Sequence, residues 1–206
     1  MLKIMRFWFL LFLGLSPQPF SFSENAAQFK FSSLVSTGTH IEIFKGHGFH
    51  ASGPYISHLS SDGTLRFTCL SRGKCVFRAG INQSQLILNA RNGSAKVTNI
   101  SNLKIKAQWS AIDAAGFDEI VMMAHQAPAI IKPNPAADVK ISQQNADVTL
   151  LIPDQGWTVE AQANEVFDKS PFRENTDLLN QGHASVQVNA GRLVIPEVLV
   201  SNEGHQ

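Results

Sequence analysis

The alternation of apolar and polar residues is the feature that most constrains how this chain can fold. Within residues 182–201, every second residue is apolar in two short runs, Val186 with Val188 and Leu193 with Ile195. Residues two apart in a strand point to the same face, so each run predicts a strand with one buried face. Asn189-Ala190-Gly191 separates the runs, and glycine tolerates the positive φ of a tight hairpin. The stretch therefore predicts a β-hairpin with one apolar face.

The stretch 147–168 has the same pattern. Val148 and Leu150 alternate with polar residues, the sequence Pro-Asp-Gln-Gly at 153–156 supplies turn residues, and Trp157 and Val159 resume the alternation. A second hairpin is therefore predicted immediately upstream of the first.

The remaining chain predicts further short strands. Asn92-Gly93 is a strong two-residue hairpin signal. Residues 100–112 alternate strictly and predict one long strand, and residues 114–125 favour a strand over a short helix. Residues 127–137 contain three prolines and predict an extended connection. Many short strands and no helical periodicity predict an all-β fold, a sandwich or a rolled sheet, formed by residues 24–206 as a single domain.

The first 23 residues predict a cleaved signal peptide. Lys3 and Arg6 precede an apolar run at 7–15, and Ser21-Phe22-Ser23 offers small residues for a peptidase, with cleavage after Ser23. The run is shorter than the roughly 20 residues that a membrane span needs. An uncleaved anchor is the alternative. The protein is therefore expected to be exported.

Cys69 and Cys75 are the only cysteines. The loop residues between them and the β-prone sequence on both sides predict a disulfide that links the arms of a hairpin in an oxidising compartment. The alternative is a metal or redox pair, which usually has a closer spacing or further thiols.

The charge is nearly balanced. Removing Lys3 and Arg6 from the 17 basic residues leaves 15 against 16 acidic residues, a formal charge of −1 with histidine neutral. Because no block of like charge appears, the sequence gives no electrostatic argument for a nucleic-acid partner or an anionic membrane surface.

No enzymatic motif or cofactor fingerprint is present, so we expect no catalytic activity and no cofactor. Ser71 and Lys74 have the spacing of a serine–lysine nucleophile pair. That chemistry requires a helical turn to place the lysine beside the serine, whereas these two residues lie within a predicted loop. Four histidines could form a metal site only if a turn brought them together, namely His40, His47, His50 and His58. Surface positions are the default for them, so no metal is predicted.

Trp109 and Trp157 both lie in apolar alternations, which favours core packing, with an internal apolar groove as the alternative.

Two segments carry a resemblance to a known family. The sequences G-H-A-S-V-Q-V-N-A-G-R-L-V-I-P at 182–196 and W-T-V-E-A-Q-A-N-E-V-F-D at 157–168 resemble the OstA-like domain of periplasmic lipopolysaccharide-transport proteins. The resemblance implies a twisted antiparallel β-jelly roll of stacked short hairpins. It also implies a non-enzymatic periplasmic protein that binds lipid and carries or bridges lipopolysaccharide between membranes.

The same resemblance suggests where lipid would bind and how the domain would assemble. Acyl chains would lie against the inner apolar face of the sheet, and exposed sheet edges would pair with like domains. The residues expected to line the lipid site are Val148, Leu150, Trp157, Val159, Val186, Val188, Leu193 and Ile195. Two alternatives remain: an exported structural, adhesion or sugar-binding β-sandwich with fully packed apolar faces and no lipid ligand, and a hydrolase whose site the sequence does not reveal.

Overall fold

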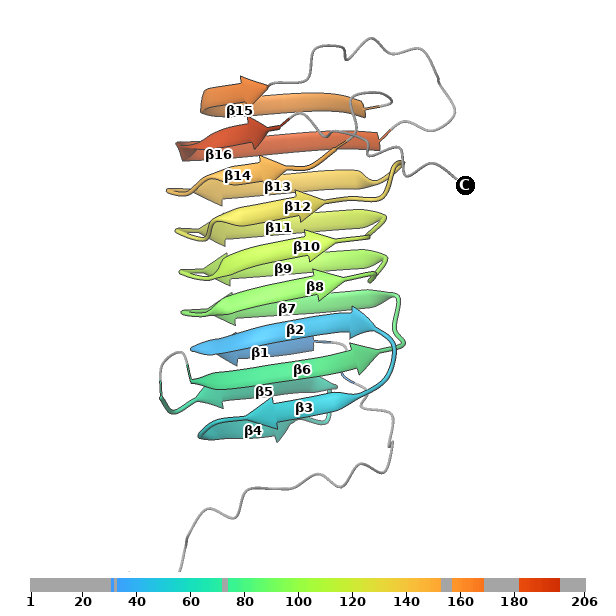
Figure 1. Ribbon diagram of the computed structural model, residues 1–206, viewed down its shortest axis with the longest axis vertical. Helices are drawn as coiled ribbons and strands as arrows, with labels where there is room; N and C mark the ends of the chain where they lie inside the picture. Colours follow the sequence, from blue (N-terminus) through green and yellow to red (C-terminus); the bar gives the residue numbers. More distant parts are fainter. Residues whose placement is uncertain (1–30, 32, 72–73, 153–156, 169–181, 197–206) are drawn as a thin grey trace, which may run out of the picture.

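The computed structural model describes residues 31, 33–71, 74–152, 157–168 and 182–196. The described chain forms β-strands in two facing layers that stack along one long axis (Figure 1). The predicted signal peptide, residues 1–23, and the predicted turn at 153–156 lie outside the described residues. No helix among the described residues is long and apolar enough to cross a membrane.

Within the described residues, each layer contains seven strands, and two further strands pass through both layers at one end of the stack. In spatial order, the first layer contains β4 (Tyr55–Leu59), β5 (Thr64–Cys69), β1 (Ser33–Thr37), β7 (Gln85–Arg91), β9 (Asn102–Gln108), β11 (Glu119–His125) and β13 (Asp138–Gln144). The second layer contains β3 (Phe49–Ser52), β6 (Cys75–Ile81), β2 (Thr39–Lys45), β8 (Ser94–Thr98), β10 (Ala111–Ala115), β12 (Ala129–Lys132) and β14 (Val148–Leu150). The two longest strands complete the stack, β16 (Gly182–Ile195) and then β15 (Trp157–Asp168).

The predicted all-β class is confirmed, but the predicted antiparallel hairpins are wrong. Of the described strand pairs, only β3 with β6 and β4 with β5 are antiparallel, and the others are parallel. The two strands around Asn92-Gly93 do not pair with each other, because β7 pairs with β1 and β9 while β8 pairs with β2 and β10. The predicted jelly roll is therefore not confirmed. The chain forms a β-solenoid in which each turn contributes one strand to each layer.

The two C-terminal hairpins are corrected in the same way. The stretch around Asn189-Ala190-Gly191 is one strand, β16, which passes from the first layer to the second at Ala190, where φ is 55°. β14 and β15 do not form a hairpin either, because β14 pairs with β12 and β16 while β15 pairs with β16 in parallel.

A residue with positive φ stands at the corner from the first layer to the second in six of the described turns. Trp109 follows β9 with φ of 51°, and Gln126 follows β11 with φ of 49°. The same corner position is occupied in other turns by Gly38, Asn92, Asn145 and Ala190. The Trp109 N–H donates to the His125 carbonyl at 3.0 Å, so the corners also bond along the stack. The corner sends the chain into the facing layer instead of back along its own sheet. It also divides the predicted long strand at 100–112 into β9 and β10.

The solenoid has a repeat that explains its regular corners. β7, β9 and β11 begin at Gln85, Asn102 and Glu119, which are 17 residues apart. The residue after the corner is small in five turns, namely Gly93, Ser110, Ala127, Ala146 and Gly191. A Cβ added to Gly93 would meet the Thr39 carbonyl of the neighbouring turn. The close stacking of successive turns therefore requires a small side chain at this position.

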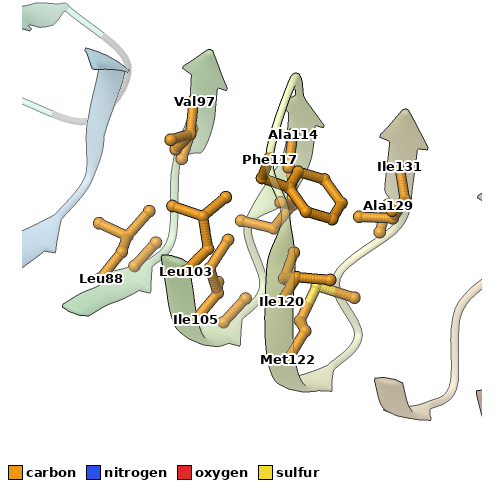
Figure 2. Close-up of a cluster of buried hydrophobic side chains, with 14 of the residues drawn as sticks. Leu88, Val97, Leu103, Ile105, Ala114, Phe117, Ile120, Met122, Ala129 and Ile131 are labelled. Carbon is orange, nitrogen blue, oxygen red and sulfur yellow. The ribbon is translucent and has the colours of Figure 1, made fainter. Parts of the chain in front are cut away.

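Apolar side chains from both layers meet in the interior. Leu88, Ile105 and Met122 occupy matching positions in adjacent strands of the first layer and face Val97, Ala114 and Ile131 of the second (Figure 2). All six are at most 1% exposed. The alternation that predicted half-buried strands is thus satisfied by a continuous core between the layers.

Two other predictions are resolved by the strand positions. The segment 114–125 contains strand β11, as favoured, while the proline-containing segment 127–137 includes β12, a strand within the second layer and not only a connection.

The predicted Cys69–Cys75 disulfide is present, with the Cα atoms 5.6 Å apart. It joins β5 of the first layer to β6 of the second, so it links the two layers and not the arms of a hairpin.

Candidate functional site

A groove crosses the outer face of the first layer, and we call it the lateral groove. It has a volume of about 710 Å³ and is lined by Val35, Ser36, Thr37, Arg66, Asn89, Ala90, Arg91, Lys106, Ala107, Gln108, Met123, Ala124, His125, Ser142 and Gln144. These residues come from β5, β1, β7, β9, β11 and β13, which are consecutive in the sheet. With strands about 4.8 Å apart, the groove extends about 24 Å along the stack.

Two rows of outward-facing side chains form the sides of the lateral groove. One row runs through Asn89, Lys106 and Met123, which are cross-strand partners, and the other runs through Arg91, Gln108 and His125. Between the rows lies the backbone of small residues whose side chains point inward, Ala90, Ala107 and Ala124. Since the floor carries no large side chain, the two rows border an open channel.

The groove lining combines positively charged and other polar side chains with the apolar Val35 and Met123. Arg66, Arg91 and Lys106 are exposed, and the lining contains no Asp or Glu. None of the three cations forms an ion pair with a described carboxylate. Amide and hydroxyl groups of Asn89, Gln108, Gln144 and Ser142 supply both hydrogen-bond donors and acceptors. These side chains can donate and accept hydrogen bonds and carry positive charge, which suits the binding of a polar ligand.

Trp109 lies beside this groove. Its indole ring is 49% exposed and is 6.4 Å from the His125 ring, edge to face, and its Nε1–H donates to the Gln126 side chain. The predicted core position is therefore wrong for Trp109, because the residue occupies a left-handed corner and leaves the alternation. It is confirmed for Trp157, which is 4% exposed.

The eight residues predicted to line a lipid site do come together, at the end of the solenoid formed by β14, β15 and β16. Seven of them are at most 4% exposed and belong to the core between the layers, while Val159 is half-buried against it. The buried seven are Val148, Leu150, Trp157, Val186, Val188, Leu193 and Ile195. The structure therefore places them as core residues, and a lipid ligand there stays a prediction.

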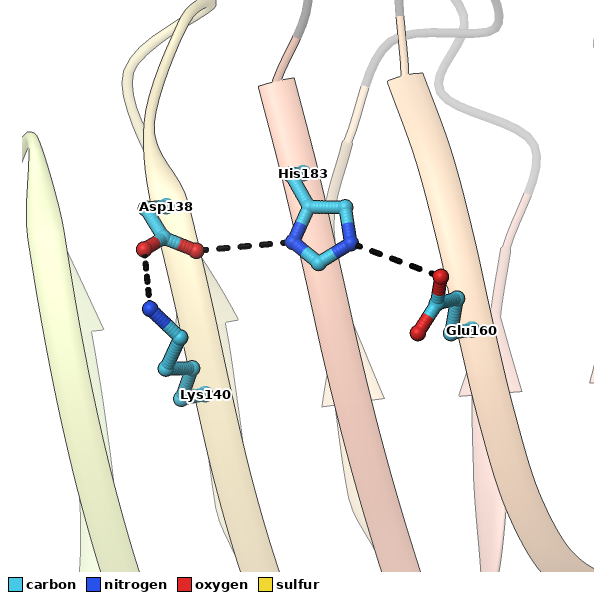
Figure 3. Close-up of polar contacts among 4 residues, drawn as sticks. All are labelled: Asp138, Lys140, Glu160 and His183. Carbon is cyan, nitrogen blue, oxygen red and sulfur yellow. Dashed lines mark hydrogen bonds and ion pairs between the residues drawn. The ribbon is translucent and has the colours of Figure 1, made fainter.

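A second polar cluster lies near the same end. Asp138 of β13 accepts a hydrogen bond from Lys140 Nζ at 2.5 Å, and its other oxygen is 3.5 Å from His183 Nδ1 of β16 (Figure 3). His183 Nε2 is 3.9 Å from Glu160 Oε1 of β15. The hydrogen bond from Lys140 lowers the pKa of Asp138, and His183 contributes in the same direction. This cluster does not line the lateral groove, and its contacts join three adjacent strands, β13, β16 and β15.

The described residues contain no group of three or more His, Cys, Asp or Glu side chains that could hold a metal ion. Among the histidines considered from the sequence, His40 contacts Ser94 Oγ at 2.6 Å and His47 contacts the Asn82 amide at 3.3 Å. These histidines therefore have ordinary polar partners on the protein surface.

Sequence reasoning missed the groove, although part of its signal is present in the repeat. Asn89, Lys106 and Met123 are 17 residues apart, so a search for that period would have aligned them in one row. Arg66 would still have been missed, because β5 lies beyond β1 in the stack, out of sequence order.

No protein-family model matches the chain, and no curated protein sequence matches it. One solved structure that this chain resembles is described as a "putative cell adhesion protein" from Clostridium sporogenes. It is 10% identical, with a TM-score of 0.46, over 82% of this chain and 93% of that chain. A likeness at this level leaves the function of the present chain open.

Proposed function

We propose that this protein is an exported, non-enzymatic binding module that holds an extended glycan in the lateral groove. This corresponds to the adhesion or sugar-binding alternative drawn from the sequence. The observation that supports it is the groove itself, a channel about 24 Å long on a rigid sheet face. A long, shallow channel suits a chain-like ligand that can contact several strands at once.

The chemistry of the lining supports a sugar ligand. Amides and hydroxyls bond to sugar hydroxyls as both donors and acceptors, and Asn89, Gln108 and Gln144 present amides from three different strands. The half-exposed Trp109 ring at the groove edge offers a flat apolar surface, with a polar N–H at one end, against which a sugar ring can lie.

The test is direct binding of the purified mature protein to a panel of neutral and acidic polysaccharides by titration calorimetry. The double variant Asn89→Ala/Gln108→Ala should weaken binding roughly 30-fold, because two lost hydrogen bonds at about 1 kcal/mol each make about 2 kcal/mol. Thr149→Ala, on the second layer, is the matched control and should bind normally. Failure to bind any polysaccharide, or equal binding by the groove variant, would reject the proposal.

Lipid carriage, with lipopolysaccharide as the cargo and pairing with like domains, remains a prediction that no observation favours over the groove. A lipid at the predicted position would have to separate the two layers, since seven of the eight residues are buried among core side chains. Native mass spectrometry of the gently purified protein tests this hypothesis. A co-purifying amphiphile that Val188→Asp removes from a folded protein would support it, and a clean apo mass would count against it.

A further inference from the structure

We infer that the lateral groove selects an acidic polysaccharide, one that bears carboxylate or sulfate groups, over a neutral one. This inference rests on the proposed function and specifies its ligand class. The groove gathers three cationic side chains, Arg66, Arg91 and Lys106, from strands β5, β7 and β9. Among the described residues, no acidic side chain lines the groove and no carboxylate pairs with these three cations.

The spacing of the cations fits a repeating anionic chain. β7 and β9 are adjacent, and β5 is separated from β7 by β1. Arg66, Arg91 and Lys106 thus span about 14 Å along the groove, at one and two strand spacings from one another. Arg66 and Lys106 belong to one outward row, through Val35 and Asn89, and Arg91 belongs to the other row. Three like charges on neighbouring strands, with no described anionic partner, favour a ligand chain with several negative groups.

The positive charge is particular to this face. On the second layer, the corresponding outward row alternates in sign through Arg78, Glu42, Lys96 and Asp113, and Arg78 forms an ion pair with Glu42 at 3.2 Å. The complete sequence is nearly neutral, with 17 basic and 16 acidic residues. A general attraction for polyanions is therefore not expected, and any such attraction should depend on the groove.

Sugar is favoured over nucleic acid as the anionic chain. Proteins that bind nucleic acid tightly commonly make 6–10 phosphate contacts, about twice or more the number that three cations can supply. Non-specific single-strand binding also relies on several aromatic platforms, whereas the groove and its edge have two aromatic rings among the described residues, Trp109 and His125. The remaining polar lining consists of amides and hydroxyls, which match a hydroxyl-rich chain.

The experiment compares ligands with one backbone and different charge: dextran, carboxymethyl-dextran and dextran sulfate. Binding of the full mature protein is measured at low and high salt, with oligothymidylate and polyglutamate as anions that are not sugars. We expect the two charged dextrans to bind about tenfold more tightly than dextran, with the difference shrinking as salt rises. Comparing the carboxylate and sulfate forms shows which anion the groove prefers.

Lys106→Glu is the decisive variant and should weaken binding of the charged dextrans about tenfold, because it replaces one of the three groove cations by a negative charge. Lys104→Glu is the matched control, since it makes the same charge change two residues away on β9, outside the groove lining. If dextran and its charged forms bind equally, or if both variants lose the same amount of binding, the inferred preference for an acidic polysaccharide is wrong. A glycan-binding function would still stand. If oligothymidylate or polyglutamate binds as tightly as the charged dextrans, the inference that the anionic chain is a polysaccharide is wrong. Failure of all three dextrans would count against both proposals.

Discussion

The two ends of the solenoid are built differently. At one end, β3 and β4 are only four and five residues long, and they run antiparallel to their neighbours. At the other end, β15 is a 12-residue strand that runs parallel to β16, and β16 is its only partner among the described strands (Figure 1). Exposed strand edges can pair with other chains, and short or irregular edge strands reduce that risk. The first end is therefore better protected than the second.

The interior differs between the ends as well. Beneath β3 and β4, the Phe77 ring contacts the rings of Phe31, Phe49 and Phe67, with centroids 5.0–6.3 Å apart, and Tyr55 stacks on Phe67 at 4.4 Å. On β15, by contrast, Val166 and Phe167 are 48% and 46% exposed. An aromatic cluster and a disulfide close one end of the core.

At the β15 end, ion pairs of partly exposed side chains add to the strand pairing. His183 connects β13 and β15 through Asp138 and Glu160, and Arg192 donates to Asp147 at 2.5 Å and 3.0 Å. Pairs of this kind usually contribute about 1 kcal/mol or less. We therefore expect the β15 end to open more readily than the end closed by the disulfide. Measurements of local stability can test this difference.

The largest expected effect comes from the aromatic cluster. Phe77→Ala should lower the free energy of unfolding by about 3–5 kcal/mol, because it leaves a cavity among fully buried rings. Phe167→Ala, on β15, is the matched control and should cost about 0.5 kcal/mol or less, because its ring is already half exposed. Urea unfolding followed by circular dichroism measures both. Similar losses in the two variants would show that the ends do not differ in packing.

The disulfide should have an intermediate effect. The double variant Cys69→Ala/Cys75→Ala should lose about 2 kcal/mol, since the bridge closes a short loop between positions six apart. A reducing agent should bring the wild-type unfolding curve down to that of the variant and leave the variant unchanged. A wild-type curve that is insensitive to complete reduction would mean that the bridge does not stabilise this end.

The alternation in the sequence correctly predicted the strands and their buried faces, but not their partners. A period of two reports that one face of a strand is buried, and a strand in a hairpin and a strand in a solenoid satisfy it equally. Asn92 illustrates the ambiguity, because the positive φ of a hairpin turn and that of a solenoid corner favour the same residue types. What separates the two folds is the 17-residue spacing of Asn92, Trp109 and Gln126, a long-range property of the sequence.

The candidate site was less predictable than the fold. Lys106 and Arg91 are 15 residues apart, so they form no block of charge in the sequence and become neighbours only through the stacking of β7 on β9. Trp109 was placed in the core because it continues an apolar alternation, and only the left-handed corner reveals that its ring is exposed. In both cases the surface arises from the relation between turns of the solenoid.

The smallest effect concerns the ion pairs near β15. The hydrogen bond from Lys140 lowers the pKa of Asp138, so the ionised carboxylate is favoured in the folded state. Its contribution is therefore present above the usual aspartate pKa of about 3.9 and is lost as the pH falls through the lower folded-state value. Asp138→Asn should cost at most about 1 kcal/mol at neutral pH, and the difference from wild type should disappear in acid.

Asp113→Asn, which removes a carboxylate without a described ion pair, should follow the wild-type pH curve more closely. Urea midpoints measured across this pH range decide the matter, because a loss in Asp138→Asn that persists in acid would arise from packing and not from charge.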